Sequence, residues 1–392
     1  MGGRAAAYIV AVKRTPIGRL GGVLAQVALE DLLASLIRAL IAEAGIDPVE
    51  IDDVIVGNAA GPGGNPARLA ALQAGLPLDI PGFSVDRQCG SGLEAVNLAA
   101  ALVKAGQGEI FLAGGAESPS TAPQRMLRQT DGSLKLSYRA RFSPDAIGDP
   151  DMGVAAENVA AQRGIGRERQ DRFALDSHRK AVAAIEAGAL AEEIVPIETG
   201  EGGTVTVDQC PRRDTSLEKL AALRPVFVEG GTVTAGNACP VNDGAALALV
   251  VSERVLRRLK PALVLRHVDG KARGVDPNLL GLGPIASTRA LLRANPDVTM
   301  DSIDLVEFNE AFASQVLACL DALEIDPQRV NPGGGALAFG HPWGASGAIL
   351  VARLFSQMAR RGGPSVAKRG LATIGIGGGL GISTLFERQE SL

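Results

Sequence analysis

The sequence has few aromatic residues, few cysteines and no long hydrophobic run. Only 3% of its 392 residues are aromatic, and it contains 4 cysteines and 3 histidines. The cysteines lie far apart, with no CxxC pair and no Cys/His cluster, which argues against a zinc site or a disulfide framework. Gly, Arg or Asp interrupts each of the longest apolar stretches. We therefore expect no metal site, no disulfides and no membrane span.

The charge is also weak, since the formal net charge is -4 and 21% of the residues are charged. This balance gives no overall basic field, so nucleic acid is not an expected partner. The first residues, "MGGRAAAYIVAVKRTPIG", lead directly into a strand-like run without the parts of a signal peptide. These features predict a soluble, cytoplasmic protein.

What the sequence has in abundance is small residues, with 49 glycines and a hydrophobic fraction of 46%. Strand-like runs such as "AAYIVAV" and "EIFLAGG" alternate with helical stretches such as Leu29 to Ala44 and Glu94 to Lys104. This alternation predicts an α/β architecture in which helices cover sheets. Residues 118–242 break the pattern with polar, Pro/Gly-punctuated segments, and we interpret them as an insertion.

An internal repeat is visible when residues 36–58 are laid on residues 287–309 without a gap. Arg38 then falls on Arg289 and Asn58 on Asn309. Continuing the same offset places Cys89 opposite the neighbour of His341, and each is followed by a small-residue turn and a helical stretch. The repeat predicts two similar halves, with Cys89 and His341 on equivalent loops that face each other across a pseudo-twofold axis.

Cys89, in "DRQCGSGLEA", directly precedes a predicted helix. Because a helix start offers unpaired N–H groups and positive potential, we expect a lowered thiol pKa and a nucleophilic thiolate. The alternative is a small apolar residue under a helix. The flanking glycines and the apposed histidine favour the nucleophile.

His341, in "GGGALAFGHPWGASGA", has the surroundings of a positioned base, because Pro342 and the glycines fix the backbone. We expect His178 and His267 to be ordinary surface or strand residues. Asn309, in "EFNEAFA", ends a predicted strand and is a candidate to orient a water molecule or to donate to an oxyanion. Alone it is equally typical of a turn.

Several segments resemble the signature blocks of the thiolase family, in the family's order and over nearly the whole chain. They are "KRTPIGRLGG", "NPARLAALQAGLP", "DRQCGSGLEA", "TAGNACPVNDGAA", "EFNEAFA", "VNPGGGALAFGHPWGASGA" and "GIGGGLG". The resemblance implies the thiolase fold, with two duplicated βαβαβαββ halves in a five-layered αβαβα arrangement plus an inserted loop domain. We assign residues 1–117 with 243–260 to the first half, 118–242 to the loop domain that binds CoA, and 261–392 to the second half.

The resemblance also implies the chemistry. Thiolases form or split a carbon–carbon bond through an acyl-cysteine, so Cys89 would be acylated and His341 would be its base. Asn309 would hold a water that forms, with His341, an oxyanion hole for the enolate. The backbone N–H groups of Cys89 and Gly377 would form a second oxyanion hole for the tetrahedral intermediate.

Acyl-CoA and CoA are the substrates that the resemblance implies, with no further cofactor and no metal. Arg212 falls where the family contacts the nucleotide end of CoA, and Met152 and Phe312 fall at pocket-lining positions. A nearby basic run suits the CoA phosphates or is simply a solvated face; it consists of Arg125, Arg128, Lys135, Arg139 and Arg141. The family also implies a homodimer or homotetramer, and a partner subunit is a further possibility.

One departure from the family lies next to the terminal glycines. Gly375 stands where the family carries the second cysteine, the acid/base that moves the α-proton of acetyl-CoA. Cys239, where the family commonly has Ser, is our candidate for a replacement.

Three hypotheses follow from this departure. The first is a thiolase that borrows an acid/base from elsewhere. The second is an acyl transfer or decarboxylative, ketoacyl-synthase-like condensation by Cys89, His341 and Asn309. The third is a non-catalytic acyl-CoA-binding subunit, which would need neither Cys89 nor His341.

Overall fold

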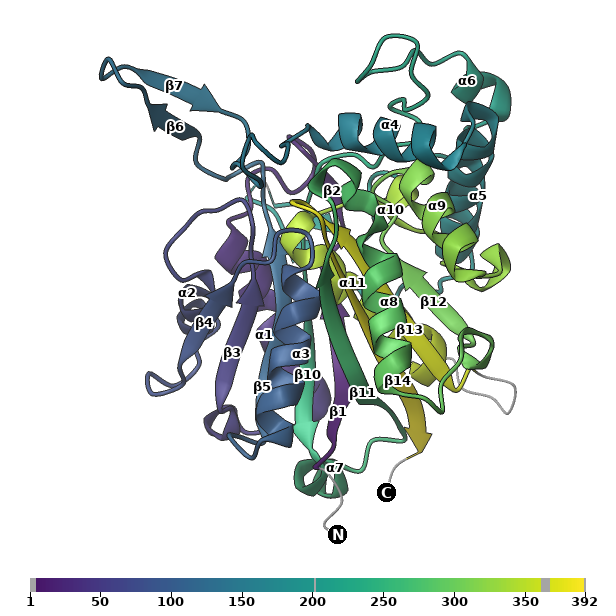
Figure 1. Cartoon of the computed structure of the whole chain (residues 1–392). Coiled ribbons are helices and arrows are strands. Elements are labelled where there is room, and N and C mark those ends of the chain that lie inside the picture. Colours follow the sequence, from purple (N-terminus) through teal and green to yellow (C-terminus); the bar gives the residue numbers. More distant parts are fainter. Residues whose placement is uncertain (1–4, 201, 361–366, 391–392) are drawn as a thin grey trace.

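The computed structural model describes residues 5–200, 202–360 and 367–390 (Figure 1). The first half of the chain forms a sheet in the order β4-β3-β5-β10-β1. Strand β3 runs parallel to both β4 and β5, whereas β10 runs antiparallel to β5 and to β1. The strands are β1 (Ala7–Arg14), β3 (Asp53–Gly57), β4 (Gly82–Val85), β5 (Ile110–Glu117) and β10 (Asn242–Ser252), and a short β2 (Gly18–Arg19) also pairs with β10.

The second half repeats this order as β12-β13-β14-β11. Strand β12 is parallel to β13, and β14 is antiparallel to β13 and β11, as in the first half. The equivalent of the edge strand β4 is reduced to one parallel bridge between Val306 and Val330. The strands are β11 (Leu263–Gly274), β12 (Leu305–Phe308), β13 (Arg369–Ile376) and β14 (Leu380–Glu390).

The two halves are joined along β1 and β11, which pair antiparallel at Ala7–His267, Tyr8–Arg266 and Ile9–Leu265. The repeat predicts two similar units but not this hydrogen-bonded edge. The strands therefore follow one continuous path across both halves (Figure 1).

The helices form three layers around this path. Helices α1 (Leu29–Ala44) and α2 (Pro66–Gln73) cover the outer face of the first half, and α8 (Gly283–Ala294) and α9 (Ala313–Leu323) cover that of the second. Helices α3 (Ser91–Lys104) and α11 (Trp343–Phe355) pack together between the two halves. This order of layers is the five-layered arrangement expected from the sequence.

Helix α1 shows why the sequence forms these layers. Its buried residues follow one another at spacings of one to three positions, so a single apolar stripe faces the sheet. The helix ends at Gly45, which adopts the left-handed conformation with φ 63° and donates its N–H to the Ile41 carbonyl.

The inserted segment lies across the end of the sheet from which β5 and β13 emerge (Figure 1). Its β6–β7 hairpin projects away from the body of the molecule. The segment contains β6 (Arg125–Arg128), β7 (Leu134–Ser137), α4 (Met152–Arg163), α5 (Arg167–Glu186), β8 (Ile197–Glu198), β9 (Thr204–Val205) and α6 (Leu217–Ala221).

Short elements complete the chain. They are α7 (Glu253–Leu259), α10 (Ala336–Phe339), the 3-10 turns η1 (Pro48–Glu50), η2 (Pro277–Leu282), η3 (Met300–Ser302) and η4 (Pro327–Arg329), and the π-helical turn η5 (Ser356–Arg360). Among the residues that the structure describes, no helix has the length and apolar character needed to cross a membrane.

Glycines let the starts of α3 and α11 touch. A Cβ on Gly92 would lie 2.6 Å from the carbonyl oxygen of Gly344 and 3.0 Å from the backbone nitrogen of Ala348. A Cβ on Gly347 would lie 2.5 Å from the backbone nitrogen of Leu93. Since the opposing atoms belong to the backbone, neither helix can accommodate a side chain there without moving apart.

We predict that Gly92→Ala lowers the free energy of unfolding by roughly 1–3 kcal/mol, the usual cost of overpacking a close contact. Chemical denaturation measures this change. The control is Gly200→Ala, because a Cβ there meets nothing within 4 Å. Equal stability of the two variants would show that the helix crossing tolerates a side chain.

Candidate active site

Cys89 and His341 occupy equivalent places at the crossing of α3 and α11. Cys89 precedes Gly90, the N-cap of α3, and His341 precedes Pro342, the N-cap of α11. Because the first turns of the two helices touch, both residues lie at the same end of this helix pair, beside the ends of the parallel strands. Ligand sites of α/β sheets are commonly found at such strand ends.

The backbone N–H groups of Gly377 and of Cys89 itself act to lower the pKa of the Cys89 thiol. Burial nevertheless raises the pKa of this thiol to about 12, and the charges of Glu117 and Asp86 act in the same direction. The expectation of a lowered pKa is therefore wrong, because loss of solvation outweighs the N–H groups near the helix start. The resting thiol is protonated, and it needs a base.

His341 is buried, and burial lowers its pKa to about 3, so the imidazole is neutral. Its Nδ1 lies 2.5 Å from Ser346 Oγ, and its Nε2 lies 3.5 Å from Asn309 Nδ2. An amide that donates to Nε2 requires a lone pair there, so the proton sits on Nδ1 and points to Ser346. This tautomer leaves Nε2 as the basic atom.

Asn242 and Gly340 hold the histidine loop in place. The backbone N–H of His341 donates to Asn242 Oδ1 at 3.0 Å. Gly340 has a φ of 107°, and a Cβ there would lie 2.2 Å from the Asn242 side chain. A glycine is therefore required for this amide to reach His341.

The end of β13 packs on the cysteine loop. A Cβ on Gly90 would lie 2.4 Å from Ile376 Cδ1, so only glycine allows this approach. Gly375 is partly exposed between the buried residues Ile374 and Ile376. The position at which a second cysteine was expected is thus accessible and carries no side chain.

The nearest neighbour of that position is Gln315. A Cβ on Gly375 would lie 3.3 Å from Gln315 Nε2. The Gln315 side chain is 2% exposed, and neither its Nε2 nor its Oε1 has a hydrogen-bond partner among the described residues. An amide does not titrate near neutral pH, so Gln315 cannot take over the acid/base role of a thiol.

Cys239 lies in a segment that runs between Phe312 and His341. Ala238 forms a bridge with Phe312, and Val241 forms one with His341. Burial raises the pKa of the Cys239 thiol, and the neighbouring Cys89 raises it further. Cys239 is therefore a protonated thiol within electrostatic reach of Cys89.

Met152 and Phe312 are linked by Phe227, a residue that the sequence did not single out. The rings of Phe227 and Phe312 meet edge to face, with 6.1 Å between their centroids. Gly153, which follows Met152 in α4, leaves room for the Phe227 ring, because a Cβ there would lie 2.1 Å from it. Phe227 remains 42% exposed, so this apolar surface is open to a ligand.

Arg212 is exposed in the loop before α6, and its backbone N–H donates to His178 Nδ1 at 3.2 Å. His178 is buried in α5, so the expectation of a surface or strand residue is wrong for it, whereas His267 is a buried residue of strand β11, as expected. In the basic run, Arg139 binds Asp149 and Asp151, and the charge of Arg139 is already balanced.

Glu117 is a further residue of the site that the sequence did not reveal. It is fully buried at the end of β5, and burial raises its pKa to about 7. Its oxygens accept hydrogen bonds from four groups, namely the Asn58 side chain and the backbone N–H groups of Ala59, Ala60 and Gly344. The carboxyl group thereby fastens the loop after β3 to the start of α11. An acidic residue that ends an otherwise apolar strand was the available signal.

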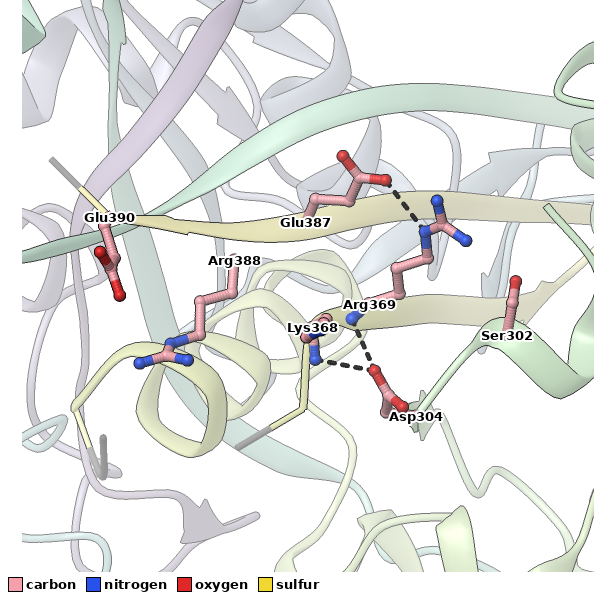
Figure 2. Close-up of a pocket in the computed structure, with 7 residues that line it drawn as sticks. All are labelled: Ser302, Asp304, Lys368, Arg369, Glu387, Arg388 and Glu390. Carbon is pink, nitrogen blue, oxygen red and sulfur yellow. Dashed lines mark hydrogen bonds and ion pairs between the residues drawn. The ribbon is translucent and has the colours of Figure 1, made fainter. Parts of the chain in front are cut away.

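A separate cavity lies away from these residues. It measures about 540 Å³ and is lined by Ser302, Asp304, Lys368, Arg369, Glu387, Arg388 and Glu390 (Figure 2). Asp304 accepts the backbone N–H groups of Lys368 and Arg369, and the Arg369 guanidinium binds Glu387. These groups largely satisfy one another, and none of the reactive residues lines the cavity.

Comparison with known proteins identifies the family. The model of the thiolase N-terminal domain matches residues 7–254, and that of the thiolase C-terminal domain matches residues 262–388. The chain belongs to the thiolase family. Both the resemblance predicted from the motifs and the thiolase-type acyltransferase function that it implied are confirmed.

Relatives cover the chain almost completely. An acetyl-CoA acetyltransferase of Pseudomonas aeruginosa is 42% identical over 97% of this chain and 99% of the relative. The crystal structure of the Bacillus anthracis acetyl-CoA acetyltransferase has a TM-score of 0.90 and 35% identity, covering 99% of this chain and 100% of that one. Human mitochondrial 3-ketoacyl-CoA thiolase has a TM-score of 0.90 and 34% identity, with 98% of each chain covered. The predicted thiolase fold is confirmed.

We predict that His341→Ala slows alkylation of Cys89 by iodoacetamide at pH 7.5 by about 100-fold or more, because a positioned base contributes roughly 10² to 10⁴ in rate. Without His341 the buried thiol has no neutral imidazole to receive its proton. Peptide mass spectrometry follows Cys89 separately from the other cysteines. His267→Gln, which alters another buried histidine, is the control. A rate within twofold of the unaltered protein in His341→Ala would show that Cys89 ionises without this base.

Proposed function

We propose that this protein transfers an acyl group from acyl-CoA through a covalent acyl-Cys89 intermediate. The observation that carries the proposal is the placement of Cys89 and of the neutral imidazole of His341 beside the touching first turns of α3 and α11. His341 Nε2 takes the thiol proton, and Sγ forms a bond to the thioester carbonyl carbon. The carbon–sulfur bond to CoA then breaks, and the CoA sulfur takes the proton from Nε2.

The N–H groups of Cys89 and Gly377 are suited to hold the oxyanion of this step. Both lower the pKa of the Cys89 thiol in the free protein, so a carbonyl oxygen bound beside Sγ would come under the influence of the same donors. Fixed donors aimed at a developing negative charge are commonly the largest source of rate enhancement in acyl transfer.

The names of the relatives favour acetyl-CoA C-acetyl transfer or thiolysis of a 3-ketoacyl-CoA as the reaction. Asn309 and His341 would then bind the enolate, with a water held by the Asn309 amide. Gly375 bears no thiol to move the α-proton of the second substrate. We propose that the Cys239 thiol moves the α-proton instead, because the charge of Cys89 acts on the pKa of this thiol.

Decarboxylative condensation is the alternative that the site itself favours. Loss of carbon dioxide from a malonyl thioester generates the carbanion directly, so the empty position at Gly375 would not matter. Cys89, His341 and Asn309 are sufficient for this reaction.

For substrate binding we propose Arg212 at the nucleotide end of CoA and Met152, Phe312 and Cys239 along the pantetheine. The exposed Phe227 ring extends the same apolar surface. The reaction as proposed needs no metal and no cofactor besides the CoA thioester. We also propose that it takes place in the cytoplasm.

We further propose that the protein is a homodimer or a homotetramer. The β6–β7 hairpin carries exposed apolar side chains that a second copy could cover, namely Met126, Leu127, Leu134 and Leu136. Light scattering on the purified protein distinguishes these states from a monomer or from a complex that requires a partner subunit.

Incubation with a panel of acyl-CoAs should add one acyl mass to the protein, and Cys89→Ala should abolish this addition. Intact-mass spectrometry measures it. A chase with CoA, acetyl-CoA or malonyl-CoA then identifies the acceptor. Cys319→Ala is the matched control, because that buried cysteine lies in α9. Failure of every acyl-CoA to modify Cys89 would leave only a binding role.

Cys239→Ser should reduce thiolysis of acetoacetyl-CoA by about 100-fold, the lower end of the usual contribution of an acid/base. Acylation of Cys89 should persist. In the same background Gly375→Cys should restore thiolysis, whereas Gly375→Ala should not. Unchanged turnover in Cys239→Ser would remove Cys239 from the mechanism, and malonyl-CoA would become the acceptor to test first.

A further inference from the structure

A small cavity adjoins the histidine loop. Its lining joins Asn309, Gly340 and Ser346, all near His341, to the charged residues Arg14, Glu307 and Arg353. Its volume is about 30 Å³, which is enough for one or two water molecules. The reactive histidine is therefore connected to a buried cluster of charges.

One face of α11 forms a wall of this cavity. Ser346, Leu350 and Arg353 are four and three positions apart and thus lie on the same side of the helix. Ser346 contacts His341 Nδ1 at 2.5 Å, and Arg353 binds Glu193 at 2.8 Å. The same helix face consequently reaches from the imidazole to the ion cluster.

Several buried polar atoms near the cavity lack partners. Arg353 Nε and Nη2 and Gln357 Oε1 make no hydrogen bond within the described part of the chain. Buried donors and acceptors without protein partners are where ordered water is normally found. The cavity thus has both the room and the polar groups that water requires.

Glu307 is the titratable group of this wall. It is 1% exposed and accepts a hydrogen bond from Gln357 Nε2 at 2.5 Å. Arg353 attracts its negative charge, whereas Glu193 and Glu310 repel it. Burial dominates and raises the pKa of Glu307 to about 7.

The neighbouring carboxyl of Glu193 behaves differently. Burial raises its pKa, but Arg353 and Arg14 outweigh burial and hold that pKa at about 2. Arg14 also binds Asp208, so its charge is shared between two carboxylates. Glu193 is therefore ionised throughout the neutral range, and Glu307 can exchange a proton there.

We propose that Ser346, water in the cavity and Glu307 form a proton path behind His341. The inference rests on the proposed function, in which Cys89 gives its proton to His341. As the Cys89 proton arrives at Nε2, the Nδ1 proton passes to Ser346 Oγ, the Ser346 hydroxyl proton passes to water, and a water proton passes to the Glu307 carboxylate. The imidazole remains neutral, Glu307 becomes the neutral acid, and the negative charge is now on Cys89 Sγ.

This path avoids the formation of a positively charged imidazolium at His341. A buried imidazolium is unfavourable at His341, as its lowered pKa shows. When the CoA sulfur takes the Nε2 proton, the transfers reverse and the Nδ1 proton returns. Ser346 and Glu307 act through His341, so both are positioning residues.

The test is the pH dependence of Cys89 acetylation by acetyl-CoA, followed by rapid quenching and intact-mass spectrometry between pH 5.5 and 9. Because only the Glu307 carboxylate can accept a proton, the rate should rise with pH through an inflection near 7. Glu307→Gln and Ser346→Ala should each lose this inflection and react about 10- to 100-fold more slowly, up to the lower range for a proton-transfer group. Ser346→Thr, which keeps the hydroxyl, should retain it.

Glu310→Gln is the matched control for Glu307→Gln. Glu310 is equally buried and lies three positions away, but it is bound by Ser177, Asn331 and the backbone of Leu337 and does not line the cavity. It should keep the inflection. If Glu307→Gln and Ser346→Ala both keep the inflection and react within twofold of the unaltered protein, the path is overturned while the acyl-Cys89 function stands. If the unaltered protein is not acetylated at Cys89, both proposals fail.

Discussion

The site depends on the contact between the first turns of α3 and α11. Gly92 meets the backbone of Gly344, and Gly347 meets that of Leu93, at distances that exclude any side chain. Each helix carries one half of the chemistry just before its N-cap, so this contact sets the separation of Cys89 and His341. Glu117 strengthens the arrangement, because it binds Gly344 of one half from the end of a strand of the other.

Much of the fold could be predicted from the sequence, because residues 36–58 and 287–309 match without a gap and indicate a duplication. Matching positions such as Asp53 and Asp304 do begin or flank equivalent strands, and the expected order of layers follows. The pairing of β1 with β11 could not be predicted, because any exposed sheet edge can form hydrogen bonds and side-chain periodicity does not specify the neighbour. The sequence also did not predict that the second-half equivalent of β4 is reduced to the Val306–Val330 bridge.

The sequence motifs predicted which residues belong to the site, but they did not predict the properties that depend on burial and on neighbouring side chains. Asn309 contacts His341, and Cys89 and His341 precede the touching first turns of α3 and α11, whereas their catalytic roles stay predictions. The protonation of Cys89 did not follow from its place near a helix start, because burial outweighs the N–H groups there. Glu117 and Phe227 act through contacts between segments distant in sequence, and the acidic end of an apolar strand indicates Glu117 but not its partners. Ser346 lies only five positions from His341, but a serine in a small-residue segment does not by itself indicate that contact.

The joined edge of β1 and β11 has a consequence for motion. Enzymes that close around a substrate by domain rotation need a hinge with few contacts between the moving bodies. Here a shared helix layer and a run of backbone hydrogen bonds connect the two halves, so no such hinge exists between Cys89 and His341 in the described chain. Cys89 and His341 therefore keep a fixed relative position before acyl-CoA binds. We infer that any rearrangement that admits the substrate takes place in the inserted segment. Acylation then requires no movement of the two halves relative to each other.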